Sequence, residues 1–245
     1  MSPRITLAVA ARVLLQIRRD RRTLAMLLVL PCALMTLLWW MFHDVGGGPF
    51  TSLGPALLAL IPFIIMFLVT SVTTLRERTS GTLERLLAMP MGKGDYLLGY
   101  ALAFGLIAAV QSALAVGLSV WLLDLGITGH AWLLLVVAVV DAILGTALGL
   151  FVSAFAQTEF QAVQFMPALV IPQILLCGLF VARDALPGVL HVVSDLLPLS
   201  YAVDAMRTVA SSTETGDVWQ DLGIIALFVV GGLALGALTL RRQSP

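Results

Sequence analysis

Six long apolar segments restrict the possible folds of this 245-residue sequence more than any other feature. A helix rises 1.5 Å per residue, so about 20 apolar residues are needed to cross the hydrocarbon core of a bilayer. Segments of suitable length cover residues 24–42, 55–75, 96–123, 131–153, 161–182 and 219–240. Backbone groups in lipid must form hydrogen bonds within their own segment, which favours helices. We therefore predict an all-α polytopic membrane protein with six transmembrane helices.

The composition supports this class and excludes others. Because 60% of the residues are hydrophobic and 11% are charged, the chain has more apolar surface than a soluble domain of its size could bury. Its formal net charge of zero offers no basic surface, so we expect no nucleic-acid partner. Cys32 and Cys177 lie within apolar segments and fit small core residues better than a disulfide or metal pair. His43, His130 and His191 lack the close spacing of metal ligands, so we expect no metal site.

The positions of the basic residues predict the orientation. Cytoplasmic flanks of spans retain Lys and Arg. If both termini are cytoplasmic, 12 of the 14 basic residues lie on that side, and only Arg183 and Arg207 lie outside. All five tryptophans then fall at the outer membrane interface, which Trp favours. We expect a multi-pass protein of the plasma or inner cell membrane with its N- and C-termini inside.

The segment before the first span is basic and amphipathic. Arg12, Gln16 and Arg19 would share one helical face, with Leu7 and Ile17 broadly opposite. This pattern predicts an interfacial helix along the anionic inner surface of the membrane. A simple positive-inside anchor explains the individual arginines equally well.

A charged stretch, RERTSGTLERLLAMP at 76–90, separates the second and third spans and is predicted to be cytoplasmic. Within it, Leu83, Leu86 and Leu87 would lie on one face of a short helix and Glu84 on another. Such a helix would be about 13 Å long, too short to be stable alone in water. It must lie against a surface, and the residues alone leave open whether that surface is the membrane or a cytoplasmic protein.

The longer run RERTSGTLERLLAMPMGKGDYLLG, at 76–99, resembles the signature of ABC-2-type exporter permeases. The stretch LPLSYAVDAMR, at 197–207, is similar to the pattern that precedes the last span in that family. Together with the six spans, the resemblance covers essentially the whole chain. It implies one transmembrane domain, 1–245, with a connecting helix in 1–23, a coupling-helix loop in 76–92 and an extracytoplasmic loop with a re-entrant segment in 183–218.

The family resemblance implies that the short cytoplasmic helix is a coupling helix seated in a cleft of an ATPase subunit. The residues that it implicates are Glu77, Arg78, Thr82, Leu83, Glu84, Arg85, Leu86 and Leu87. The chain has no G-x-x-x-x-G-K-[ST] motif, so we expect ATP and Mg to be bound by a separate subunit and no cofactor by this chain. The expected partners are two copies of an ATP-binding-cassette ATPase and a second permease subunit, forming a homodimer or heterodimer.

An apolar piece at 185–199 precedes the last span and is broken by Pro187, His191, Asp195 and Pro198. It is too short and too interrupted to cross the membrane, so it predicts a re-entrant or interfacial hairpin. The resemblance implies that this hairpin closes the outer mouth of the transport pathway.

Asp141 is the one acidic residue near the middle of a predicted span. It shares a face with Gly145 and Gly149, a G-x-x-x-G spacing that allows close helix packing. A buried acid in a span is either an ion or substrate site or a hydrogen-bonded structural group, and the sequence leaves both open.

The fifth predicted span carries polar residues and prolines that would suit a pathway wall. Gln164 and Gln173 accompany Pro167 and Pro172 in this span. The resemblance places spans two and five beside the central pathway, and we therefore nominate both glutamines, with Asp141, as pathway residues.

These observations predict the permease subunit of an ATP-driven exporter, which moves a hydrophobic drug-like or lipid-like substrate outward by alternating access. A polysaccharide or glycolipid exporter would share this architecture. A proton-coupled secondary carrier using Asp141 is the alternative of a different class, although it would predict inverted repeats that are not evident in the sequence. A membrane scaffold would need no coupling segment.

Overall fold

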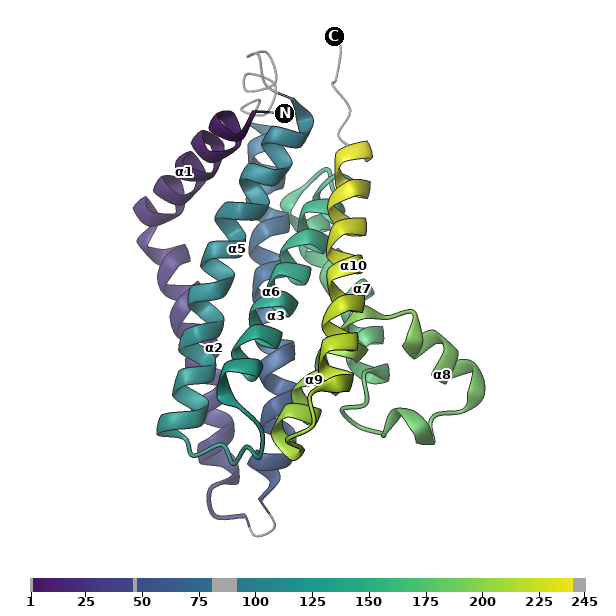
Figure 1. The fold of residues 1–245 in the computed structure, drawn as a ribbon. Helices are drawn as coiled ribbons and strands as arrows, with labels where there is room; N and C mark the ends of the chain where they lie inside the picture. Colours follow the sequence, from purple (N-terminus) through teal and green to yellow (C-terminus); the bar gives the residue numbers. More distant parts are fainter. Residues whose placement is uncertain (1, 46–47, 81–91, 240–245) are drawn as a thin grey trace.

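The computed structural model describes residues 2–45, 48–80 and 92–239, and within these ranges the regular structure is helical. Figure 1 shows the helices as a bundle with the two ends of the described chain at the same end. The long helices are α1 (Pro3–Arg19), α2 (Arg21–Phe42), α3 (Pro49–Thr79), α5 (Lys93–Gly117, continued by a π-helical turn over Leu118–Leu122), α6 (Ala131–Ser153), α7 (Glu159–Leu176) and α10 (Gly216–Thr239). A 3₁₀ turn (Arg183–Ala185) and two helices, α8 (Gly188–Asp195) and α9 (Pro198–Ser211), lie between α7 and α10.

The six predicted spans are confirmed as helices long and apolar enough to cross a membrane. Four of them lie within three residues of the predicted bounds, and the other two differ by more. The second span is longer and runs from Pro49 to Thr79. The fifth ends at Leu176 and not at residue 182, and Gly178 has a φ of +87°, a left-handed conformation that does not continue a helix.

The contact between α3 and α6 forms the centre of the bundle (Figure 1). Gly145 of α6 lies against the backbone of Phe63, and a Cβ added at Gly149 would lie 2.6 Å from the carbonyl oxygen of Phe67. Such a contact leaves no room for side chains between the two backbones. The close packing predicted from the G-x-x-x-G spacing is therefore confirmed.

The other helices surround this pair. Helix α5 packs on α6 and on α1, while α10 packs on α6 and α9. Helices α2, α7 and α10 are mostly exposed over their apolar stretches, with side chains such as Val29, Leu175 and Leu227 directed away from the bundle. Exposed apolar side chains of this kind suit contact with lipid tails.

Helix α1 packs on α5 through a buried face that includes Val9, Val13 and Ile17. Gly99 of α5 permits this contact, because a Cβ there would lie 2.6 Å from Val9 Cγ1. Ile17 therefore faces protein, whereas Leu7 is 62% exposed. The apolar residues of α1 are therefore divided between the protein and its surroundings.

The segment before the last span forms an elbow at the end of the bundle opposite to α1. Helices α8 and α9 are bent by 89° relative to each other, as in a broken span or a re-entrant loop. Helix α9 is buried through Leu199, Val203 and Met206 and packs on α3, α6 and α10. Helix α8 projects from the side of the bundle (Figure 1), and its side chains Val189 and Val192 are exposed.

We predict that Gly145→Ala lowers the stability of the protein by about 1–3 kcal/mol, because the added methyl group would overlap the backbone of Phe63. The matched control is Gly231→Ala in α10, where no atom lies within 4 Å of an added Cβ. Alanine is the better helix former, so the control should be neutral or slightly stabilising. Thermal unfolding of the purified protein in detergent measures both, and equal midpoints would contradict the close α3–α6 contact.

Candidate functional site

The last turn of α3 carries three consecutive charged residues that bond to different parts of the bundle. A helix of 31 residues is about 46 Å long and exceeds the roughly 30 Å of bilayer hydrocarbon, so its final turn can extend beyond the apolar layer. Successive helical residues point about 100° apart, which sends the side chains of Arg76, Glu77 and Arg78 in three directions. We call these residues and their partners the α3-end cluster.

Glu77 is buried and bonds to α1. Its carboxylate accepts two hydrogen bonds from Nη2 of Arg12, at 2.8 Å to Oε2 and 3.1 Å to Oε1. The same nitrogen donates to the hydroxyl of Tyr100 in α5 at 2.7 Å, and the Arg12 guanidinium lies 5.9 Å from the centre of that ring. Removing one member of a buried ion pair leaves the other uncompensated, so Arg12 holds α1 to the end of α3.

Arg76 and Arg78 reach two other helices. Nε and Nη2 of Arg76 donate to the two carboxylate oxygens of Glu159, the first residue of α7, at 2.7 and 2.9 Å. This pair is exposed to its surroundings and contributes little stability by itself. Nη1 of Arg78 donates to the carbonyl oxygen of Ser153, the last residue of α6. The end of α3 is thereby bonded directly to α1, α6 and α7, and through Arg12 it is linked to α5.

Asp95 joins the beginnings of α1 and α5 beside this cluster. Its carboxylate accepts hydrogen bonds from the backbone nitrogens of Ser2 and Gly92 at 2.9 and 3.1 Å, and from Oγ1 of Thr6 at 3.1 Å. An acidic residue in the first turn also suits the positive end of the helix dipole. The first residues of α5 are therefore fixed to α1 directly after the 81–91 segment.

The predicted coupling residues divide between the described and undescribed parts of the chain. Glu77 and Arg78 belong to α3, where Glu77 is buried and Arg78 is partly buried. The other six, Thr82, Leu83, Glu84, Arg85, Leu86 and Leu87, lie outside the described residues. The structure thus places two of the eight inside the bundle, directly before the segment that holds the rest.

The three pathway candidates do not meet at one site. Asp141 is fully buried in α6, and no described residue hydrogen-bonds to its carboxyl group. Gln164 is exposed on α7. Gln173 is buried farther along α7, where its Nε2 donates to the carbonyl of Leu169 and its Oε1 accepts from the backbone nitrogen of Leu199.

A second charged cluster, which the sequence did not predict, lies at the α8–α9 elbow. Arg183 bonds to the carboxylates of Asp195 and Asp204 and donates through Nε to the hydroxyl of Ser194 at 3.0 Å. Its guanidinium also lies 5.2 Å from the centre of the Tyr201 ring. We call these five residues the elbow cluster. They join the segment after α7 to α8 and α9, and their separation in the sequence left no periodic pattern to reveal them.

Neither cluster resembles a catalytic centre or a metal centre. Within residues 2–45, 48–80 and 92–239, no group of three His, Cys, Asp or Glu side chains is placed to hold a metal ion. Cys32 and Cys177 are both free thiols, located in α2 and directly after α7. The chemistry available to the α3-end cluster is electrostatic attachment of helices to one another, which suits the transmission of movement.

Comparison with known proteins relates the chain to transporters. The ABC-2 type transporter family matches residues 5–210. The chain is 26% identical over 169 residues to the "Probable multidrug ABC transporter permease YbhR" of Escherichia coli (strain K12), covering 69% of this chain and 46% of that protein. It is 25% identical over 194 residues to "ABC transporter G family member 20" of Dictyostelium discoideum, covering 78% and 27%.

A third relative is the "Linearmycin resistance permease protein LnrN" of Bacillus subtilis (strain 168), which is 23% identical over 185 residues, covering 73% of this chain and 48% of that protein. The chain therefore spans about half the length, or less, of the curated relatives compared. The family match includes the α3-end cluster and most of the elbow described above.

We predict that Arg12→Met lowers the unfolding free energy by about 3–5 kcal/mol, because it leaves the buried Glu77 carboxylate without its cation. Arg76→Met is the matched control, since it removes the exposed pair with Glu159 and should cost at most about 1 kcal/mol. Thermal unfolding in detergent compares the two. The double variant Arg12→Met/Glu77→Met should recover most of the loss, and failure of both expectations would contradict the assigned pairing.

We also predict that Arg183→Gln loosens the elbow, because one side chain joins α8 to α9 through two carboxylates. Amide hydrogen exchange over 188–196 should accelerate by at least about tenfold, the factor that corresponds to a loss of about 1.4 kcal/mol. Asp184→Asn is the control, because Asp184 is exposed and forms no ion pair with a described residue. Unchanged exchange in the Arg183 variant would show that the cluster does not hold the elbow.

Proposed function

The chain belongs to the ABC-2 type transporter family, and from this premise we propose that it is the membrane-spanning permease subunit of an ATP-driven exporter. Six membrane-spanning helices supply the translocation unit. ATP and Mg bind to a separate ATP-binding-cassette subunit, because the sequence has no phosphate-binding Gly-Lys motif of its own. Two ATPase copies and a second permease, either identical or related, complete the transporter.

The observation that carries this proposal is the direct attachment of the α3 end to α1, α6 and α7, with α5 joined through Arg12. The segment 81–91 follows α3 directly, and in our proposal its residues 82–87 contact the ATPase subunit. A displacement there would reach α1, α5, α6 and α7 through Glu77, Arg76, Arg78 and their partners. Glu77 and Arg78 thus act from inside the bundle, by transmitting a movement that the following residues receive.

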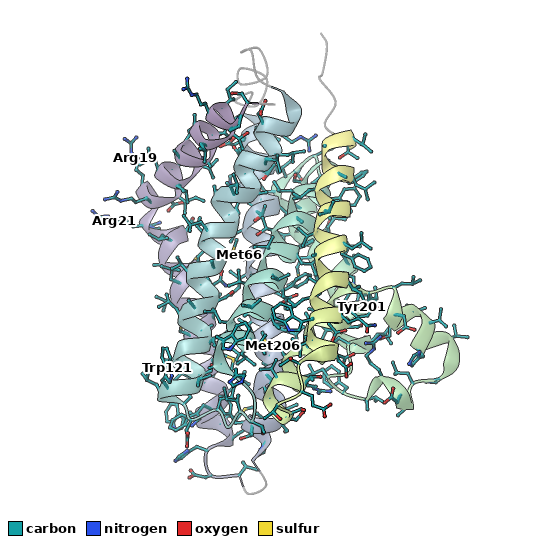
Figure 2. The ribbon with its side chains drawn as sticks, viewed as in Figure 1. Arg19, Arg21, Met66, Trp121, Tyr201 and Met206 are labelled. Atoms are coloured by element: carbon teal, nitrogen blue, oxygen red, sulfur yellow. The ribbon has the colours of Figure 1, made fainter. Side chains whose placement is uncertain are left out.

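The distribution of charge supports an orientation with the α3 end in the cytoplasm. The described arginines of α1, the start of α2 and the end of α3 lie at one end of the bundle, which is the arrangement expected of a cytoplasmic side. Figure 2 shows Arg19 and Arg21 toward this end of the bundle and Trp121 at the opposite end. Trp132 and Trp219, which pack together with ring centres 6.3 Å apart, begin α6 and α10. We therefore propose a cell-membrane protein with both termini inside.

The proposed substrate is a hydrophobic, drug-like or lipid-like compound. Relatives carry the names multidrug permease and linearmycin resistance permease, which support this class for the present chain. Asp141 is enclosed within a single copy, so a substrate would first meet exposed residues such as Gln164 on α7. We propose that α7 of two permease subunits lines a shared pathway, which opens alternately to the two sides of the membrane. The alternative is a polysaccharide or glycolipid exporter with the same architecture. It would differ in its cargo and would require the same kind of ATPase subunit.

One observation favours a second function. The Asp141 carboxyl is fully buried and has no hydrogen-bond donor among the described residues, as a proton-binding site in a secondary carrier could be. Such a carrier would work without an ATPase subunit, so the two functions give opposite results in a purification experiment.

The test is to purify the tagged protein from its native membrane in mild detergent and to identify the proteins bound to it. The exporter proposal predicts a co-purifying subunit with a nucleotide-binding motif and vanadate-sensitive ATPase activity. A partnerless protein whose substrate uptake follows the proton gradient, and is lost in Asp141→Asn, would replace the exporter with the carrier.

We further predict that Glu84→Ala/Leu86→Ala uncouples ATP hydrolysis from export by at least about tenfold, since the proposed contact with the ATPase lies in this segment. Vesicle transport and ATPase activity are measured in parallel on the reconstituted complex. The control, Leu227→Ala, truncates a side chain that is 70% exposed on α10 and should leave both activities unchanged. Normal transport by the double variant would contradict the assignment of this segment.

A further inference from the structure

Four arginines gather where α1 meets α2. Helix α1 ends at Arg19 and α2 begins at Arg21, with Asp20 between them. Arg18, Arg19, Arg21 and Arg22 are all exposed, and none forms an ion pair or a side-chain hydrogen bond with a described residue. We call these four the α1–α2 arginines; they lie at the opposite end of the bundle from the α8–α9 elbow.

Most other arginines in the described chain have partners. Arg12 and Arg76 bind carboxylates, and Arg78 and Arg207 donate to backbone carbonyls. Arg183 binds two carboxylates. Against that background, four neighbouring arginines without a side-chain partner among residues 2–45, 48–80 and 92–239 form a concentrated positive patch.

The acid between them does not neutralise the patch. The Asp20 carboxylate accepts hydrogen bonds from the backbone nitrogen and Oγ1 of Thr23, at 3.2 and 2.6 Å, and begins α2 as its N-cap. These bonds hold the pKa of Asp20 below its usual value. Asp20 is therefore charged and already engaged, and the four arginines exceed its charge by three.

The α1–α2 arginines are flanked on both sides by exposed apolar residues. Leu15 lies one turn before them in α1 and is 55% exposed, while Met26 lies one turn after them in α2 and is 67% exposed. Arg19 and Arg21 point away from the bundle, into its surroundings (Figure 2). Guanidinium groups next to the first lipid-facing side chains of a span lie at the depth of the lipid head groups.

We propose that the α1–α2 arginines form a binding site for the phosphate groups of anionic phospholipids. Guanidinium groups bind phosphate oxygens through paired, charge-assisted hydrogen bonds, and an anionic lipid also supplies the net negative charge that the patch lacks. Neighbouring zwitterionic lipids offer the phosphate without net charge, so the site selects lipids such as phosphatidylglycerol. The inference needs only the place of the chain in a membrane and not its transport activity.

The probe is dioleoyl-phosphatidylglycerol, with dioleoyl-phosphatidylcholine as the zwitterionic reference. The purified full chain in detergent is titrated with each lipid, and native mass spectrometry counts the bound molecules. We expect tighter binding of the anionic lipid, by about fivefold for each arginine attracted by its net negative charge at low salt, and weaker discrimination at high salt. In the quadruple Arg→Gln variant of the α1–α2 arginines, the ratio of anionic to zwitterionic lipid affinity should fall by at least about tenfold.

Two controls separate this site from general effects of charge and folding. Arg4→Gln removes an exposed arginine at the far end of α1 and should keep the preference. The quadruple Arg→Lys variant keeps the charge and should retain partial selectivity, which also shows that the chain folds with all four positions replaced. Equal binding of both lipids by the wild type would overturn the proposal. An unchanged lipid preference in the Gln variant, with loss of a co-purifying ATPase subunit, would assign the patch to that protein instead.

Discussion

A buried carboxylate at the end of the longest helix is the interaction on which the rest of the architecture depends. Glu77 is buried in the last turn of α3, and a cation held against it offsets the cost of burying its charge. Arg12 supplies that cation from a helix 65 residues earlier in the chain. The pair therefore fixes α1 to the bundle and holds this basic N-terminal helix against the end of α3.

The packing of α3 against α6 links this end of the bundle to the opposite end. Gly145 and Gly149 bring two backbones together without side chains between them, which makes the pair resistant to bending or sliding. At the opposite end the buried helix α9 packs on both α3 and α6, and Arg183 ties α8 to it. In the proposed mechanism, a movement received after α3 would reach the elbow through this series of packed helices and ion pairs.

Local features of the sequence predicted the spans well and the clusters poorly. Apolar length is a property of each segment alone, so six spans were foreseen, and the spacing of Gly145 and Gly149 predicted close packing because it is periodic. The end of the fifth span was wrong because Gly178 adopts a left-handed conformation, which hydrophobicity does not report. The pairing of Arg12 with Glu77 depends on which helices become neighbours, and no single segment contains that information.

The most direct test of this account measures the distance between its two ends during ATP turnover. Spin labels at Leu15 on α1 and Val192 on α8, both exposed positions, report that distance by pulsed electron paramagnetic resonance in the reconstituted complex. The account predicts that trapping with ATP and vanadate shifts the distance distribution, and that the shift disappears when the segment after α3 is uncoupled from the ATPase. An unchanged distribution in a complex that hydrolyses ATP and transports its substrate would contradict transmission through the end of α3.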